Sequence, residues 1–197
     1  MPSHLIDYAL FGDQFSTAEM RAIFDERAML QRWLDVEAAL AAAQAEVGVI
    51  PREAADAIAR AARVDALDLE AVRAGIRTTA HPIVPVVREL ERASGEAGRW
   101  VHWGATTQDI IDTGMVLQAK AALEALRRDL LALVGVLADL AERHRDTVMA
   151  GRTHGQQALP MTFGFKVATW VAELGRHVER VDQLRPRVCV GELAGAV

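Results

Sequence analysis

The chain has 197 residues, of which 51% are hydrophobic and 25% are charged, a balance typical of a globular protein that can bury a core. Its net charge of -5 and the lack of a basic run argue against nucleic acid as a partner. Cys189 is the single cysteine, the N-terminus has no secretory pattern, and the apolar run Leu130–Leu140 is too short to cross a membrane. We therefore expect a soluble cytoplasmic protein without a membrane partner.

The first half of the chain is predicted to form helices separated by glycine and proline. Ser16 and Glu19 have the spacing of a capping box, and apolar residues then recur at helical intervals. Gly48 and Pro51 end this long helix and begin a shorter, alanine-rich one. The expected helices of this half cover roughly residues 16–48, 51–63, 69–76 and 82–95.

The second half is predicted to contain two long helices around a polar connector, residues 151–160. The first runs from Thr107 to about Arg145, roughly 58 Å at about 1.5 Å per residue. A helix of that length needs other long helices beside it, from this chain or from copies of it. The second follows the connector and is expected to end at Pro186. No alternating strand pattern is found, so the predicted class is all-α, with these domains: a small N-terminal helical domain, 1–105, and the first part of a long-helix bundle, 106–197.

Polar chemistry is concentrated in three stretches at helix boundaries: "TAHPIVP" (79–85), "VHWGATTQDIIDT" (101–113) and "GRTHGQQALP" (151–160). Each contains one histidine. In the second stretch, Thr106 and Asp109 have capping-box spacing, and the helix N-terminus they create attracts carboxylates. The alternative is that Thr106, Thr107 and Asp109 only cap the helix.

The third stretch combines a proton-transfer group with carboxylate-binding groups. Arg152 can form two parallel hydrogen bonds to a carboxylate, and Thr153 and Gln156 can donate further ones. The imidazole of His154 is the kind of side chain that can give or take a proton in catalysis. The alternative is a histidine satisfied by the backbone beside an arginine in an ordinary salt bridge. Spacings typical of metal ligands or of a serine or cysteine nucleophile are missing from the sequence.

The stretches "VHWGATTQDIIDT" and "GRTHGQQALP" resemble the first and second shared regions of the fumarase/aspartase superfamily. Within it they resemble the branch of adenylosuccinate lyase and 3-carboxy-cis,cis-muconate cycloisomerase. The resemblance implies a homotetramer of long helices whose active sites are each shared by three chains. It also implies elimination, or the reverse addition, of a group beta to a carboxylate of a small polycarboxylate, with no metal or organic cofactor.

The same resemblance implies roles for individual residues. His154 matches the general acid, and with His102 it forms the candidate catalytic pair. His81 matches a further active-site histidine, and Asp109 is expected to cap and orient. The candidate substrate-binding residues are His81, Thr106, Thr107, Arg152, Thr153 and Gln156.

One shared region of the superfamily has no counterpart in this sequence. It is a flexible loop of the form GSSxMPxKxNP, which carries the serine assigned as the catalytic base. Members of the superfamily are also more than twice as long as this chain. The chain is therefore expected to be an N-terminal portion that is inactive by itself.

The two branches are distinguished by a few positions. Trp103 and Gln108, in "HWGATTQD", resemble the cycloisomerase. His81 and His154 resemble adenylosuccinate lyase, although that enzyme usually has aspartate at the position of Pro82. The best hypothesis is a lactonizing 3-carboxy-cis,cis-muconate cycloisomerase, and the alternative is a C–N lyase that releases fumarate. A third hypothesis is a non-catalytic helical oligomerisation module, based on the heptad-like stripes of the long helices.

Overall fold

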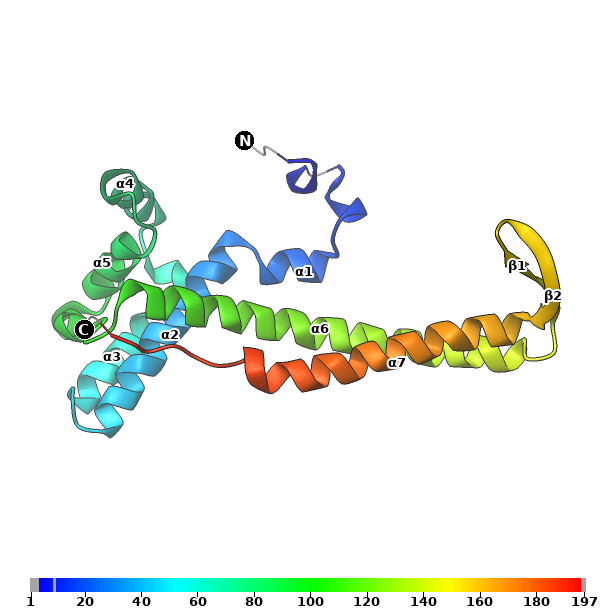
Figure 1. Ribbon diagram of the computed structural model, residues 1–197. Coiled ribbons are helices and arrows are strands. Elements are labelled where there is room, and N and C mark those ends of the chain that lie inside the picture. Colours follow the sequence, from blue (N-terminus) through cyan, green and yellow to red (C-terminus); the bar gives the residue numbers. More distant parts are fainter. Residues whose placement is uncertain (1–3, 9, 196–197) are drawn as a thin grey trace. The chain divides into compact units, whose positions relative to one another are not determined.

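The computed structural model describes residues 4–8 and 10–195, and these form two compact units (Figure 1). Unit 1 comprises Met1–Ala119 and Cys189–Val197, and unit 2 comprises Lys120–Val188. The long helix α6, Thr107–Arg143, contributes residues to both units. The predicted all-α class is confirmed. In the described ranges, no helix is both long and apolar enough to cross a membrane.

Unit 1 consists of short helices around the start of α6. Its other elements, in chain order, are η1 (Leu5–Asp7), η2 (Gly12–Gln14), α1 (Ala18–Ile23), α2 (Glu26–Glu46), α3 (Arg52–Ala61), η3 (Val64–Ala66), α4 (Leu69–Thr79), α5 (Ile83–Ala93) and η4 (Gly95–Trp100).

The prediction of one helix over 16–48 was wrong, because two helices occupy this range. Asp25 has an extended backbone, and its side chain accepts a hydrogen bond from the Arg27 N–H, so it caps a new helix after α1 ends. The predicted cap was also one residue early. Thr17, not Ser16, accepts the hydrogen bond from the Met20 N–H, at 3.1 Å. Apolar periodicity continues across such a break, so the pattern alone did not reveal it.

The core of unit 1 lies where α2 packs against α3 and the helices that follow. Leu34, Ile58, Ile83 and Leu90 have no exposed surface. Burying a leucine or isoleucine side chain contributes about 1.5–3 kcal/mol. The burial of this cluster therefore stabilises the packing of the helices in unit 1.

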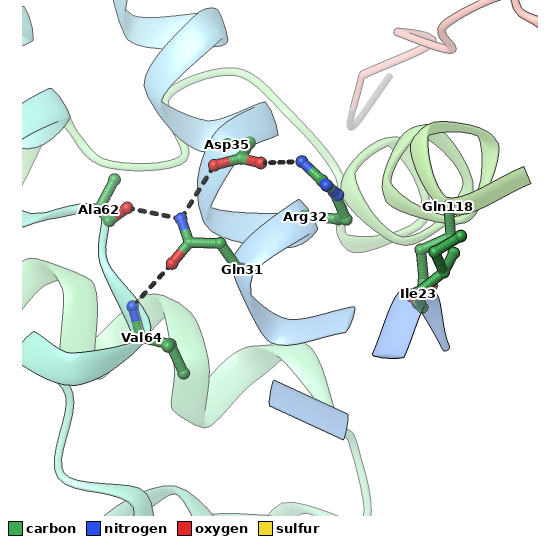
Figure 2. Close-up of polar contacts among 7 residues, drawn as sticks. All are labelled: Ile23, Gln31, Arg32, Asp35, Ala62, Val64 and Gln118. Carbon is green, nitrogen blue, oxygen red and sulfur yellow. Dashed lines mark hydrogen bonds and ion pairs between the residues drawn. The ribbon is translucent and has the colours of Figure 1, made fainter. Parts of the chain in front are cut away.

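Glutamine side chains on α2 and α6 form hydrogen bonds with the backbone of neighbouring segments (Figure 2). Gln31 Nε2 donates to the Ala62 carbonyl at 3.0 Å, and Gln31 Oε1 accepts from the Val64 N–H at 3.0 Å. On α6, Gln118 Nε2 donates to the Ile23 carbonyl at 2.8 Å. These bonds satisfy the carbonyls at the ends of α3 and α1 and the N–H at the start of η3, which lack partners within their own helices.

Unit 2 contains the rest of α6, the strands β1 (Val148–Thr153) and β2 (Gln156–Thr162), and α7 (Phe163–Val188). The two strands pair antiparallel, with Thr153 opposite Gln156. The expectation of an irregular connector and of no strands was therefore wrong here. His154 and Gly155 both have left-handed backbones, with φ of 51° and 71°, which suits a two-residue hairpin turn. α7 also continues through Pro186, which was predicted to end it.

α7 runs antiparallel to the later part of α6 (Figure 1). Arg127 donates to both carboxylate oxygens of Asp182, at 2.5 and 3.0 Å, and Arg185 donates to Glu124 at 2.7 Å. Apolar side chains nevertheless remain exposed in this unit, since two helices alone cannot cover both stripes. On the two helices these are Leu126, Leu131, Leu133, Val136, Phe165, Trp170 and Leu184.

The close approach of α7 to the end of α6 gives a testable prediction at Gly164. An added Cβ would lie 2.4 Å from the Ala141 carbonyl oxygen and 2.6 Å from Arg145 Cα, whereas Gly175 on the same helix has open space. We expect Gly164→Ala to destabilise the chain by about 1–3 kcal/mol. Gly175→Ala should stabilise it by about 0.5–1 kcal/mol through helix propensity. Denaturant unfolding measures both, and equal effects would contradict the close contact.

Candidate active site

His102 is fixed by a buried carboxylate on a different helix. Its side chain is 16% exposed, and the side chain of Glu37, on α2, is 3% exposed. His102 Nδ1 lies 2.6 Å from Glu37 Oε1, and the backbone N–H of His102 donates to Glu37 Oε2 at 3.2 Å. A carboxylate only accepts hydrogen bonds, so Nδ1 carries the proton. Nε2 is thereby left as the ring nitrogen that can exchange a proton with a ligand.

The surroundings of His102 favour its charged form. The hydrogen bond that His102 Nδ1 donates to Glu37 raises the pKa of His102 above its usual value, although burial opposes this. The negative charges of Asp109 on α6 and Glu91 on α5 raise the pKa of His102 further. His102 can therefore remain protonated to a higher pH than a free histidine, and the resulting positive charge can bind an anion.

The raised pKa of His102 predicts that its contribution to stability depends on pH. The folded pKa lies above the unfolded value, so the contribution is complete below about pH 6.5. It should be lost as the pH rises through the folded pKa. The measurement is the difference in unfolding free energy between wild type and His102→Asn, since asparagine tolerates the left-handed backbone of position 102, φ 58°. A difference that grows with pH would contradict the prediction.

The N-terminus of α6 lies a few residues beyond His102. The Thr106 N–H donates to Asp109 Oδ2 at 2.8 Å, which confirms the predicted cap by Asp109. The carboxylate of Asp109, 1% exposed, also accepts from the N–H groups of Ala194, at 2.9 Å, and Gly195, at 3.2 Å. Burial alone would raise the pKa of Asp109, but these hydrogen bonds lower it below its usual value. Asp109 therefore serves the structure, while Thr106 and Thr107 remain half-buried beside the helix end.

His81 lies between α4 and α5, also in unit 1. The preceding Ala80 is left-handed, with φ of 53°, and the N–H of His81 donates to Thr79 Oγ1 at 3.2 Å. Its side-chain Nδ1 is buried and finds no hydrogen-bond partner among the described residues. The residue is thus held at the start of α5 with an unused ring nitrogen.

The other candidate residues surround the hairpin turn of unit 2. Thr153 and Gln156 face each other across the last strand pair, His154 is at the tip, and Arg152 is one residue further back. All four are exposed. Within the part of the chain that is described, Arg152 forms no ion pair, so the ordinary salt bridge considered for it is not found there. These side chains are open to a ligand or to another polypeptide.

The structure thus divides the candidates between the units. His81, His102, Thr106 and Thr107 belong to unit 1, and the hairpin residues belong to unit 2. Sequence reasoning missed Glu37. Its signal was available, because Glu37 stands in the apolar stripe of α2, between Leu34 and Ala41. A carboxylate on a buried helix face requires a partner.

The chain matches a family model described as lyase over residues 14–197. It therefore belongs to this lyase family of the fumarase/aspartase superfamily.

Its relatives carry different activities at nearly equal identity. An N-acetyl-S-(2-succino)cysteine lyase of Enterococcus italicus is 47% identical over the whole chain, which covers 43% of that protein. An adenylosuccinate lyase of Pyrococcus horikoshii is 48% identical with the same coverage. A 3-carboxy-cis,cis-muconate cycloisomerase of Pseudomonas aeruginosa is 47% identical over 95% of the chain and 42% of its own length. The chain thus spans less than half the length of these relatives.

Solved structures share the fold. A fumarate lyase from Mesorhizobium is 46% identical, with a TM-score of 0.88 over 92% of this chain and 43% of its own. A 3-carboxy-cis,cis-muconate lactonizing enzyme from Pseudomonas putida is 41% identical, with a TM-score of 0.91 over 96% of this chain and 44% of its own. The fold of this chain is therefore that of the N-terminal portion of such enzymes.

Proposed function

We propose that this chain provides part of an enzyme that eliminates a group beta to a carboxylate, or adds one in reverse, by acid–base chemistry. The observation that carries the proposal is the imidazole of His102, which is held through Nδ1 and lies close in sequence to the N-terminus of α6. Its Nε2 forms no hydrogen bond with the residues that the structure describes. An imidazolium and a helix N-terminus both attract carboxylates. Membership of the lyase family supports the same reaction class.

In this mechanism, one carboxylate of the substrate binds at the N-terminus of α6, with Thr106 and Thr107 as donors and His102 beside them. The hairpin of another chain in the assembly contributes Arg152, Thr153 and Gln156, which bind a second polar group of the substrate, and His81 lines the site. His154, as general acid, gives a proton to the leaving group while a base takes the proton next to the carboxylate. The reaction requires no cofactor.

We further propose that the complete protein assembles as a homotetramer whose active sites are shared between chains. The exposed apolar side chains of unit 2 support this, because other long helices would cover them. Light scattering of the complete gene product tests the assembly. A stable monomer would contradict it.

Our first candidate for the activity is that of a 3-carboxy-cis,cis-muconate cycloisomerase, supported by Trp103 and Gln108 in "HWGATTQD". The second candidate is a C–N or C–S lyase that releases fumarate, favoured by His81 and His154 and by relatives that match the whole chain. The complete gene product should be assayed with 3-carboxy-cis,cis-muconate, adenylosuccinate and N-acetyl-S-(2-succino)cysteine. Lactone formation supports the first candidate and fumarate release the second.

An inert protein of the expected fold would instead favour the helical oligomerisation module.

The role of Thr107 gives a further prediction. Thr107→Val keeps the shape of the side chain but removes its hydroxyl, and with it one hydrogen bond to a charged carboxylate. Such a bond contributes about 1.5–3 kcal/mol, so we expect KM to rise by about tenfold or more. Thr107→Ser, which keeps the hydroxyl, is the control. Unchanged KM and kcat in the valine variant would mean that Thr107 only caps α6.

A further inference from the structure

Glu37 has a buried carboxylate whose two oxygens both accept hydrogen bonds from one residue, His102. Glu37 Oε1 accepts from His102 Nδ1 at 2.6 Å, and Oε2 accepts from the His102 backbone N–H at 3.2 Å. The side chain is 3% exposed. Desolvating a carboxylate costs several kcal/mol, and an apolar residue of similar volume at such a position is often neutral or stabilising. Packing alone therefore does not account for a glutamate in the apolar stripe of α2.

The backbone of His102 is strained, which is a second unfavourable contribution to stability at this position. Its φ of 58° lies in the left-handed region, where residues other than glycine are strained. The bond from its N–H to Glu37 stabilises this conformation, and the bond from Nδ1 orients the ring. The buried carboxylate of Glu37 thus both stabilises the strained backbone of His102 and fixes the orientation of its ring.

We propose that Glu37 is a positioning residue for the reaction, which fixes the His102 ring through Nδ1 and keeps its Nε2–H available to a carboxylate of the substrate. The proposal rests on the proposed function. In its charged form His102 is the donor, and Glu37 supplies the balancing negative charge from the buried side. Glu91 and Asp109, on α5 and α6, add negative charge around the same ring.

A second side chain of α2 provides a matched control. Gln44 lies two turns after Glu37, and its Nε2 donates to the Trp103 carbonyl at 2.6 Å. It holds the same loop, and among the residues that the structure describes no hydrogen bond joins it to the imidazole. Gln44→Ala therefore loosens this loop and leaves the His102–Glu37 pair in place.

The test is Glu37→Gln, which keeps the size of the side chain and removes its charge. The titration of His102 is followed by NMR of the ring, and kcat/KM is measured against pH in the complete gene product. We expect the His102 titration and the alkaline limb of the kcat/KM profile to move together to lower pH. At pH 8, kcat/KM should fall by about 10- to 100-fold, the loss typical when the hydrogen-bond partner that orients a metal-bound histidine is removed. Gln44→Ala should leave both midpoints unchanged.

Two outcomes would overturn the positioning role. One is a folded Glu37→Gln protein with unchanged titration and unchanged alkaline limb. The other needs no variant: a wild-type His102 that titrates at or below about pH 6.5, the value of a free histidine. The titration does not depend on turnover. If Glu37→Gln shifts the His102 titration but the wild-type protein is inactive on the tested substrates, the proposed reaction is contradicted. If the protein is active but the His102 titration does not shift, only the role of Glu37 is contradicted.

Discussion

Replacing His154 with asparagine should lower turnover of the complete protein by about 10²- to 10⁴-fold, the usual contribution of a general acid. The free energy of unfolding should hardly change, because the side chain is exposed at the tip of the hairpin. Asparagine also suits the turn, since an Asn-Gly pair is preferred where both residues are left-handed. The measurements are kcat at saturating substrate and denaturant unfolding of the same preparation.

A histidine outside the candidate site serves as the control. His177 is exposed on α7, and His177→Asn should leave turnover at the wild-type level. If His154→Asn turned over substrate as fast as wild type, His154 would have no part in proton transfer. If it lost stability instead of turnover, the histidine would be a structural residue of the hairpin, which its exposure argues against.

Replacing Leu34 with alanine should have the largest effect on stability. Leu34 is completely buried on the face of α2 that packs against the rest of unit 1. Truncation of such a leucine removes its transfer energy and leaves a cavity, at a cost of about 2–5 kcal/mol. Leu34→Met keeps the volume and should cost less than about 1.5 kcal/mol. Denaturant unfolding followed by circular dichroism of the 197-residue chain measures both.

The position of Leu34 connects this prediction with the candidate site. Leu34 precedes Glu37 by three residues, so both lie on the same face of α2. A loosened α2 should also weaken the contact between Glu37 and His102. A Leu34→Ala variant as stable as Leu34→Met would show that the neighbouring helices collapse onto the vacated space, and the core would then be less rigid than its burial indicates.

Much of the helical architecture could be predicted from local patterns. The long helix from Thr107 and the capping contact of Asp109 are found as expected. Periodicity and capping are properties of neighbouring residues, so a single sequence contains them. The hairpin of residues 148–162 was missed, because its strands are mostly exposed and show no regular alternation of apolar and polar side chains. The roles assigned to the candidate residues remain predictions.

What the chain's own residue pattern decided is the helical class, most helix positions and the clustering of histidine and threonine in three polar stretches. Tertiary structure decided the pairing of Glu37 with His102, which are 65 residues apart, and the contacts of Asp109 with Ala194 and Gly195. The physical reason is the range of the interactions. Helix propensity and capping act within a few residues, whereas a buried carboxylate finds its partner only when distant segments pack against it.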